Sequence, residues 1–352
     1  MDKKPKADGK TMKRILGYIK RNYKKQFIFV IVCIILSSIA GVAGSLFLKV
    51  LIDDYITPLL LEVNPVFTGL AKAISVMIGI YVIGIISTWS YNVIMVRISQ
   101  GVLKDIRDEM FGKMQKLPIK YFDTHTHGDI MSHYTNDTDT LMQMISQSIP
   151  QLIASGTTVV AVFCSMLSIS VILTFVVILF VFLMLTVVKK VAGKSSKYFI
   201  AQQKSIGEVN GYIEEHINGQ KVVKVFCHEE EAKKKFDEIN EALCENATKA
   251  NKYANILMPI MANIGHLQYV MVAIVGGTLA INGVSGLTIG AIASFMQLTR
   301  SFTMPLTQVS QQINSIVMAL AGAKRIFELM DEEPEVDNGY VTLVNANMKM
   351  EK

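Results

Sequence analysis

Charged residues are missing from five long stretches of this 352-residue sequence, which contain no Asp, Glu, Lys or Arg. Charged residues make up 18% of the chain, against about 25% in an ordinary soluble domain. The stretches are residues 26–48, 73–96, 140–188, 253–299 and 301–323. Because a bilayer core of about 30 Å needs about 20 helical residues, stretches of 23 or 24 residues fit one span, and those of 49 and 47 residues fit two. These absences predict a polytopic membrane protein.

Motifs for covalent, metal or nucleotide chemistry are also absent. The four cysteines show no C-x-x-C spacing, so we expect neither a disulfide framework nor a metal site. The histidines His125, His127 and His133 share one loop, but that loop fits a docking tip better than a metal centre. The sequence contains no G-x-x-x-x-G-K-[ST] motif, which would hold phosphate, and no nucleophile–base–acid set. We predict no catalytic residue, metal or cofactor in this chain.

The uncharged stretches predict an all-α fold with six transmembrane helices. We place these helices at residues 26–49, 71–97, 145–167, 171–190, 255–281 and 288–317. A turn is expected at residues 168–170, and another at the breaker-rich residues 282–286. The chain then divides into an N-terminal segment (1–25), a six-helix membrane domain (26–320) and a linker (321–352).

The basic residues predict the topology of the spans. Residues 1–25 hold ten of them and the loop 189–252 holds twelve, while the third and fifth loops hold none. Basic loops stay on the cytoplasmic side, so we expect both termini and the two long loops to be cytoplasmic in a multi-pass protein of the cell membrane. The net charge of +6 is explained by basic residues that flank the membrane spans and lie near anionic lipid. We therefore expect the lipid bilayer as a partner and no nucleic acid.

The segments outside the spans have helical periodicity. In residues 229–247 apolar side chains recur every three or four positions, as on a helix with one buried stripe. The membrane helices are therefore expected to continue well beyond the bilayer. In the N-terminal segment Met12, Ile15, Leu16 and Ile19 share one face and basic residues occupy the others, which favours an amphipathic helix on the inner leaflet.

The second loop contains a short segment between two helix breaks. Pro118 ends the descending helix, Gly128 permits a turn, and Thr126 or Asp129 can cap the returning helix. Only a short transverse helix fits between them, and aromatic side chains at a loop tip are typical of a protein interface. Its candidate residues are Ile119, Tyr121, Phe122, Asp123, Thr124 and His125.

With this segment, the sequence resembles the transmembrane domain of type IV (older name, type I) ABC exporters. The resemblance covers residues 15–340 and rests on the order and spacing of elements around six spans, including the acidic pair Asp53-Asp54 and the run Pro305-Leu306. It implies that the segment is a first coupling helix, which docks on a nucleotide-binding domain. It also implies a second coupling helix near residues 211–219, docking on the opposite subunit. The candidate residues there are Gly211, Tyr212, Ile213, Glu214, Glu215 and His216.

The same resemblance implies partners that this sequence does not encode. ATP and Mg²⁺ are expected at associated nucleotide-binding domains, and the intact transporter is expected to be an ATP-hydrolysing translocase. A homo- or heterodimer that swaps two helices is also implied. Residues 331–335 resemble the linker into an ATPase domain, and residues 339–344 alternate like its first strand. We expect a truncated chain or excised domain, or alternatively a natural half that recruits its ATPase.

Residues inside the last two spans are candidates for the transport pathway. Arg300 lies near the middle of the sixth span, where arginine costs about 2.5–3.5 kcal/mol on insertion scales. Since no predicted span holds an acidic residue, it should face a watery cavity or an anionic cargo. The alternative is packing against the fifth helix or a dimer mate. The pathway candidates are Gln297, Arg300, Met304, Gln308, Gln311 and His266.

The resemblance implies export of an amphipathic substrate, such as a drug, a lipid or a peptide, by alternating access. One alternative is an ion-coupled secondary transporter, which would place carboxylates inside its spans. Another is a membrane scaffold or sensor that transports nothing. Such a protein would not depend on a nucleotide-binding domain.

Overall fold

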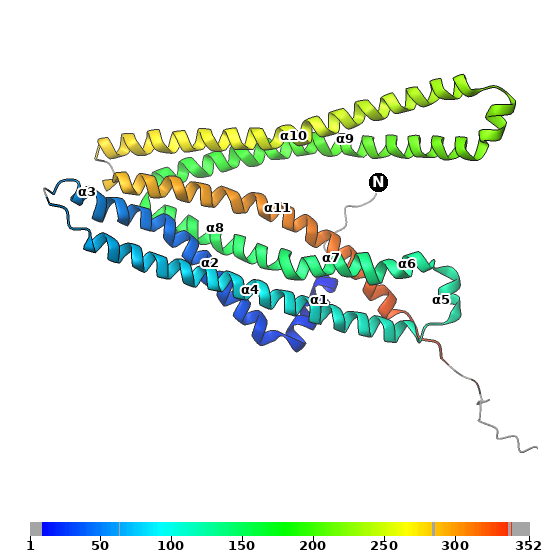
Figure 1. Ribbon diagram of the computed structural model, residues 1–352, viewed down its shortest axis with the longest axis horizontal. Helices are drawn as coiled ribbons and strands as arrows, with labels where there is room; N and C mark the ends of the chain where they lie inside the picture. Colours follow the sequence, from blue (N-terminus) through cyan, green and yellow to red (C-terminus); the bar gives the residue numbers. More distant parts are fainter. Residues whose placement is uncertain (1–8, 63, 284–285, 337–338, 340–352) are drawn as a thin grey trace, which may run out of the picture. The chain divides into compact units, whose positions relative to one another are not determined.

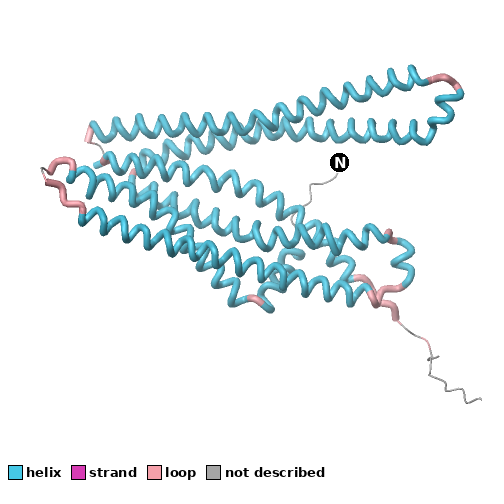
Figure 2. Tube along the Cα trace, in the orientation of Figure 1, coloured by secondary structure: helices cyan, strands magenta, loops and turns pink. Residues whose placement is uncertain are grey.

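The computed structural model describes residues 9–62, 64–283, 286–336 and 339, and this part of the chain is helical with no strand. Figure 1 and Figure 2 show long helices joined by short turns. The all-α prediction is confirmed. The long helices are α1 (Gly9–Asn22), α2 (Lys24–Val50), α4 (Thr68–Met114), α8 (Ile149–Ile169), α9 (Val171–Val225), α10 (Glu229–Ile281) and α11 (Ile289–Asp331).

Short elements connect the long helices or extend them. The α-helical ones are α3 (Thr57–Leu59), α5 (Ile119–Thr124), α6 (His127–Ser132) and α7 (Thr138–Gln143). The π-helical ones are η1 (Leu51–Ile56), η2 (His133–Asp137) and η3 (Met144–Ser148). The two expected turns are present, because α8 ends one residue before Ser170 and α10 ends at Ile281.

Five helical stretches of the described chain are long and apolar enough to cross a membrane, one fewer than the six spans predicted. They are Lys24–Leu59, Thr68–Met114, His127–Ile169, Val171–Val225 and Glu229–Ile281. The predicted span 288–317 lies in α11, which has ample length but is not among the five. Gln297, Arg300 and Gln308 interrupt its apolar sequence. A helix of this kind needs protein or water beside its polar face.

Helices α4, α9 and α10 are much longer than a bilayer requires. They contain 47, 55 and 53 residues, which at about 1.5 Å per residue gives about 70–80 Å. A bilayer with its headgroups is about 40–45 Å thick. The prediction that the membrane helices continue well beyond the membrane is confirmed.

The described residues form two compact units. Unit 1 contains those of residues 1–44, 67–162 and 304–352, and unit 2 contains residues 45–66 and 163–303. Unit 1 has a continuous apolar core to which α1, α2, α4, α7, η3 and α11 contribute. Completely buried side chains in it include Ile98, Leu103, Ile106, Leu141 and Ala323. The core thus joins elements that are distant in sequence.

The N-terminal helix α1 is part of that core. Ile15 and Ile19 are buried in it, so the stripe expected to lie on lipid is instead covered by protein at these positions. Tyr18 stacks on Phe327 of α11 with ring centroids 6.4 Å apart. Burial, with a hydrogen bond to Glu109, raises the pKa of Tyr18 to about 12. Helix α1 therefore connects α4 to the end of α11.

Unit 2 is dominated by the antiparallel pair α9 and α10, which pack along each other (Figure 1). Tyr198 stacks on Tyr253 with centroids 5.5 Å apart. Nearby, the Asn246 amide donates to the Ser205 hydroxyl at 3.1 Å. These contacts hold the pair together over its long extension.

Candidate functional site

The loop between α4 and α6 forms the short helix that its two breaks predict. Helix α4 ends at Met114, and Pro118 has extended backbone angles (φ −66°, ψ 151°) before α5 begins. The Thr126 side chain then accepts a hydrogen bond from the Asp129 N–H at 3.1 Å and caps α6. Of the two predicted caps, Thr126 is the one used.

The side chains of α5 differ from the expected exposed aromatic tip. Tyr121 and Phe122 are half-buried, and Tyr121 stacks on His125 with centroids 4.1 Å apart. Burial, then the negative charges of Glu332 and Asp129, raises the pKa of Tyr121. The exposed apolar side chain is Ile119, at 73%.

The remaining α5 candidates are arranged at the surface. Asp123 and Thr124 are exposed, and the Thr124 hydroxyl donates to the carbonyl of Lys120 at 3.0 Å. The segment that follows α11 passes close by, because the N–H of Glu335 donates to the Lys116 carbonyl at 2.7 Å. The predicted strand at residues 339–344 lies outside the described residues except for Gly339.

The residues predicted for a second coupling helix are helical, but they lie within α9. Residues 211–219 precede the end of α9 at Val225, and the chain reverses at Cys227, which has a positive φ of 55°. Figure 1 shows the last turns of α9 running across the direction of the rest of the helix. The most exposed apolar residues at this end are Ile217, Val222, Val225 and Phe226.

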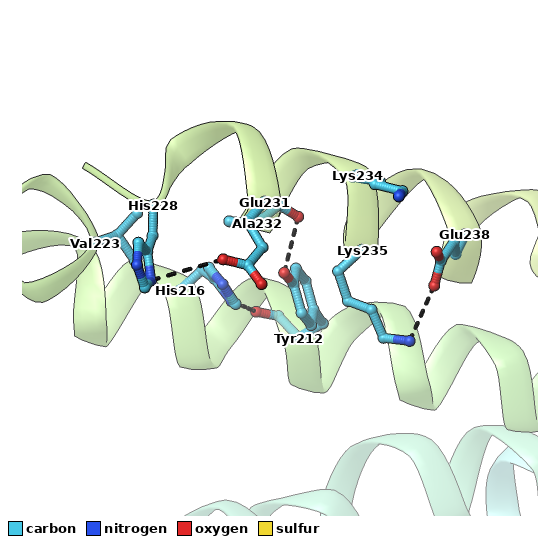
Figure 3. A pocket seen from close by; sticks show the side chains of 9 residues that line it. All are labelled: Tyr212, His216, Val223, His228, Glu231, Ala232, Lys234, Lys235 and Glu238. Carbon is cyan, nitrogen blue, oxygen red and sulfur yellow. Dashed lines mark hydrogen bonds and ion pairs between the residues drawn. The ribbon is translucent and has the colours of Figure 1, made fainter. Parts of the chain in front are cut away.

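A polar pocket of about 490 Å³ lies between the ends of α9 and α10 (Figure 3). The Tyr212 hydroxyl donates to the Ala232 carbonyl at 2.8 Å and fixes the two helix ends. His216 stacks on Tyr212 with centroids 3.9 Å apart. Gly211, Ile213, Glu214 and Glu215 are exposed beside them. Within the described chain no group of three or more His, Cys, Asp or Glu side chains could hold a metal ion.

A second polar pocket, of about 300 Å³, lies inside unit 1 between α4, η3, α8 and α11. The side-chain amide nitrogen of Gln151 donates a hydrogen bond to the side-chain oxygen Oε1 of Gln308 at 2.8 Å, which joins α8 to α11. Of the residues that line this pocket, Gln308 and Gln311 were predicted from the sequence as pathway residues, and the remaining ones were not. The complete lining is Tyr91, Asn92, Ser146, Gln147, Pro150, Gln151, Gln308, Gln311 and Gln312.

The sequence contained a signal for the missed pocket residues. Gln143, Gln147 and Gln151 recur every four residues, which places them on one helical face at the start of a predicted span. That signal was weaker than the one at Gln308, because Gln308 shares its helical face with Arg300, and an arginine interrupts an apolar stretch more than uncharged residues do.

The other pathway candidates do not line this pocket. Arg300 is exposed in unit 2, with its guanidinium carbon 5.0 Å from the centre of the Tyr269 ring. His266 and Gln297 of unit 2 are also exposed. Met304 belongs to unit 1, where it is 66% exposed. The single stripe expected on the sixth span is thus divided between the two units.

Comparison with known proteins gives the family. The model of the ABC transporter transmembrane region matches residues 27–306. An uncharacterized ABC transporter ATP-binding protein, YfiC, of Bacillus subtilis is 33% identical over 92% of this chain and 52% of its own length. A fatty acid ABC transporter ATP-binding/permease protein of Mycobacterium bovis is 32% identical over 81% of this chain and 45% of its own length. An ATP-dependent lipid A-core flippase of Pseudomonas fluorescens is 26% identical over 97% of this chain and 57% of its own length.

The chain spans about half the length of the curated relatives it matches. The family match covers most of the chain and both units described above. The chain therefore belongs to the family of ABC transporter transmembrane regions and is a multi-pass membrane protein of the exporter type.

Proposed function

We propose that this chain forms the membrane pathway of an ATP-driven exporter that moves an amphipathic substrate out of the cytoplasm. Two such membrane domains enclose the pathway, and nucleotide-binding domains that hold ATP and Mg²⁺ drive alternating access. The proposal rests chiefly on the glutamine-lined pocket of unit 1, which offers hydrogen bonds that lipid tails cannot offer.

The pocket has more hydrogen-bonding capacity than its own contacts use. Each glutamine amide has two donors and an acceptor with two lone pairs, and five glutamines line this space. The Gln151–Gln308 bond is one pairing across it. Water or the polar end of a substrate can occupy the remaining sites. No acidic residue lies in the lining, in contrast to what an ion-coupled transporter would need.

The loop ends support coupling to an ATPase on the cytoplasmic side. Ile119 on α5 and Phe226 beyond α9 expose apolar surface that a partner domain can cover. The relatives are named as ATP-binding or ATP-binding/permease proteins, which supports nucleotide-binding domains as that partner. The ten basic residues of the N-terminal segment support a cytoplasmic location for these ends.

An amphipathic substrate fits both the pocket and the names of the relatives. One relative is named for fatty acids and another for the lipid A core, and both kinds of molecule combine a polar end with apolar chains. A glutamine pocket among apolar spans can take the polar end of such a molecule. We therefore favour lipid-like substrates over peptides.

The experiment is ATP hydrolysis by the chain joined to its nucleotide-binding domain in proteoliposomes. Fatty acids, lipids, drugs and peptides are added in turn. We expect a lipid-like compound to stimulate hydrolysis and Gln151→Leu to raise the half-maximal concentration about 10-fold, the effect of losing about 1.4 kcal/mol. Gln115→Leu is the matched control, because Gln115 is exposed at the end of α4, outside the pocket. Equal behaviour of the two variants, or no stimulation by any compound, would contradict the proposal.

A further inference from the structure

We propose that Arg300 recognises the anionic headgroup of the substrate, so that the transported amphiphile carries a carboxylate or a phosphate. This inference rests on the proposed function and adds the substrate's charge to it. Tyr269 acts as a positioning residue that holds the guanidinium in place.

Arg300 carries a positive charge without a counter-ion among the described residues. Of the residues that the structure describes, none forms an ion pair or hydrogen bond with it. Residue 300 lies eleven positions into α11, about 17 Å from its start. An arginine near the middle of a helix within a membrane domain is costly without a counter-charge or water. Binding of an anion beside Arg300 would therefore be energetically favourable.

Protein carboxylates are poor candidates for that anion. The uncharged stretches contain no Asp or Glu, and a second copy of this chain would bring the same stretches. In unit 2, the carboxylate of Asp53 is already engaged by the Thr288 hydroxyl and by the Gly290 N–H, the latter at 3.0 Å. Gly290 lies ten residues before Arg300, about 15 Å along the helix. An arginine side chain does not span that distance.

The geometry leaves the guanidinium able to bind a ligand. Its carbon lies 5.0 Å from the Tyr269 ring centre, within the range of a cation–π contact. A guanidinium has five N–H donors in a planar fork, and one ring contact cannot occupy them all, so donors remain for a bidentate carboxylate or phosphate. Exposed Gln297, one turn earlier, and His266, three residues before Tyr269, add donors near the same positions.

The apolar residues near Arg300 and Tyr269 indicate that the ligand also has an apolar chain. Ala273, one turn after Tyr269 on the same face of α10, and Met296, one turn before Arg300 on the same face of α11, are half-buried apolar residues. An acyl chain can contact them while its headgroup contacts Arg300. A small inorganic anion would gain nothing from these residues, and a neutral amphiphile would leave the charge of Arg300 uncompensated.

The test measures binding to the full chain in nanodiscs of zwitterionic lipid. Oleate and oleyl alcohol differ in charge but share one chain, while acetate and inorganic phosphate lack a chain. We expect oleate to bind about 10- to 100-fold more tightly than oleyl alcohol, the range for one hydrogen-bonded charge pair. Arg300→Gln should abolish this preference and Arg300→Lys should retain part of it. The exposed residue Arg97 provides the matched control, Arg97→Gln.

The outcomes separate this inference from the proposed function. Equal binding of oleate and oleyl alcohol to the unaltered chain would overturn the inference. Stimulation of ATP hydrolysis by a neutral amphiphile would then leave the export function intact. Acetate or phosphate binding as tightly as oleate would overturn the amphiphile assignment. So would Arg300-dependent retention of phosphatidylglycerol without Arg300-dependent oleate binding, since that result would assign the site to a resident lipid. Unchanged binding of oleyl alcohol to Arg300→Gln shows that the variant is folded.

Discussion

Arg325 holds the buried carboxylate of Asp137 with two of its nitrogen atoms, although 188 residues separate them in the sequence. The Nε atom donates at 3.0 Å, and Nδ1 of His133 lies 2.8 Å from the same carboxylate. Asp137 is only 3% exposed at its side chain, while Arg325 is 54% exposed. The pair joins η2, which follows the α5 loop, to α11. It thereby connects the proposed docking loop with the helix that lines the glutamine pocket.

Removing the guanidinium should destabilise unit 1. We expect Arg325→Ala to lower the free energy of unfolding by about 1.5–3 kcal/mol, the range for a hydrogen bond to a charged group, because it leaves the Asp137 carboxylate buried with less compensation. Asp137→Asn should cost less, since it removes the buried charge together with the need for a partner. Thermal unfolding in detergent, with the double variant included, measures the coupling. Additive effects of the two changes would contradict a direct interaction.

The same pair predicts a loss of stability in acid. Burial alone would raise the pKa of Asp137, but the hydrogen bonds from Arg325 and His133 outweigh it and hold the pKa below its ordinary value. A lowered pKa in the folded state stabilises the protein above the unfolded pKa of about 3.9. This contribution is lost as the pH falls through 3.9 toward the folded-state pKa. The melting temperature should therefore fall less in Asp137→Asn than in the unaltered chain between pH 5 and pH 3. Asp139→Asn, an exposed neighbour, is the control and should behave like the unaltered chain.

How far the sequence predicted this molecule depended on the kind of signal. The long uncharged stretches fixed where helices lie, and Pro118 and Thr126 marked the boundaries of the α5 loop. Long-range pairing was out of reach, because nothing in the sequence connects Asp137 to Arg325 or Gln151 to Gln308. Burial of Tyr121 was equally hidden, since an aromatic residue on a loop tip can face the core or a partner. Amphipathicity predicted α1, but not that protein would cover Ile15.

Helix α1 provides a comparison of two neighbouring aliphatic residues. Ile15 is completely buried and Leu16 is 41% exposed. Since truncating a buried aliphatic side chain to alanine leaves a cavity, Ile15→Ala should cost about 2–5 kcal/mol, and Leu16→Ala about 1 kcal/mol or less. Chemical unfolding in detergent measures both. Similar costs would mean that α1 does not stay docked on the core in solution.

The ion pair of the same helix should matter much less. Arg14 donates to both oxygens of the Asp331 carboxylate at 2.9 and 2.7 Å and lies 4.2 Å above the Phe327 ring. The Asp331 side chain is 64% exposed, so solvent screens the pair, and exposed pairs contribute about 0–1 kcal/mol. Arg14→Ala should therefore cost less than Ile15→Ala in the same assay. A larger cost would show that the contact with Phe327 dominates.

Docking of a nucleotide-binding domain should depend on Ile119. A charge there removes apolar contact area, but leaves the fold intact because this side chain is 73% exposed. We expect Ile119→Asp to reduce substrate-stimulated ATP hydrolysis at least 10-fold with an unchanged melting temperature. Met131→Asp, at a 62% exposed apolar position on α6, controls for added charge. Tyr121→Ala is a poorer test because Tyr121 is half-buried. Normal stimulation in Ile119→Asp would exclude α5 as the docking helix.

The start of α11 should not tolerate a methyl group at Gly290. A Cβ atom there would lie 2.7 Å from the backbone carbonyl oxygen of Lys49 and 2.6 Å from a carboxylate oxygen of Asp53. Because the carbonyl cannot rotate away, Gly290→Ala should cost about 1–3 kcal/mol, and adding Asp53→Ala should not restore stability. Gly277→Ala is the matched control, since a Cβ at that helical position meets nothing within 4 Å. Equal thermal stability of Gly290→Ala and Gly277→Ala would show that α11 can shift from the end of α2 at no cost, and the contact would then not fix the two helix ends.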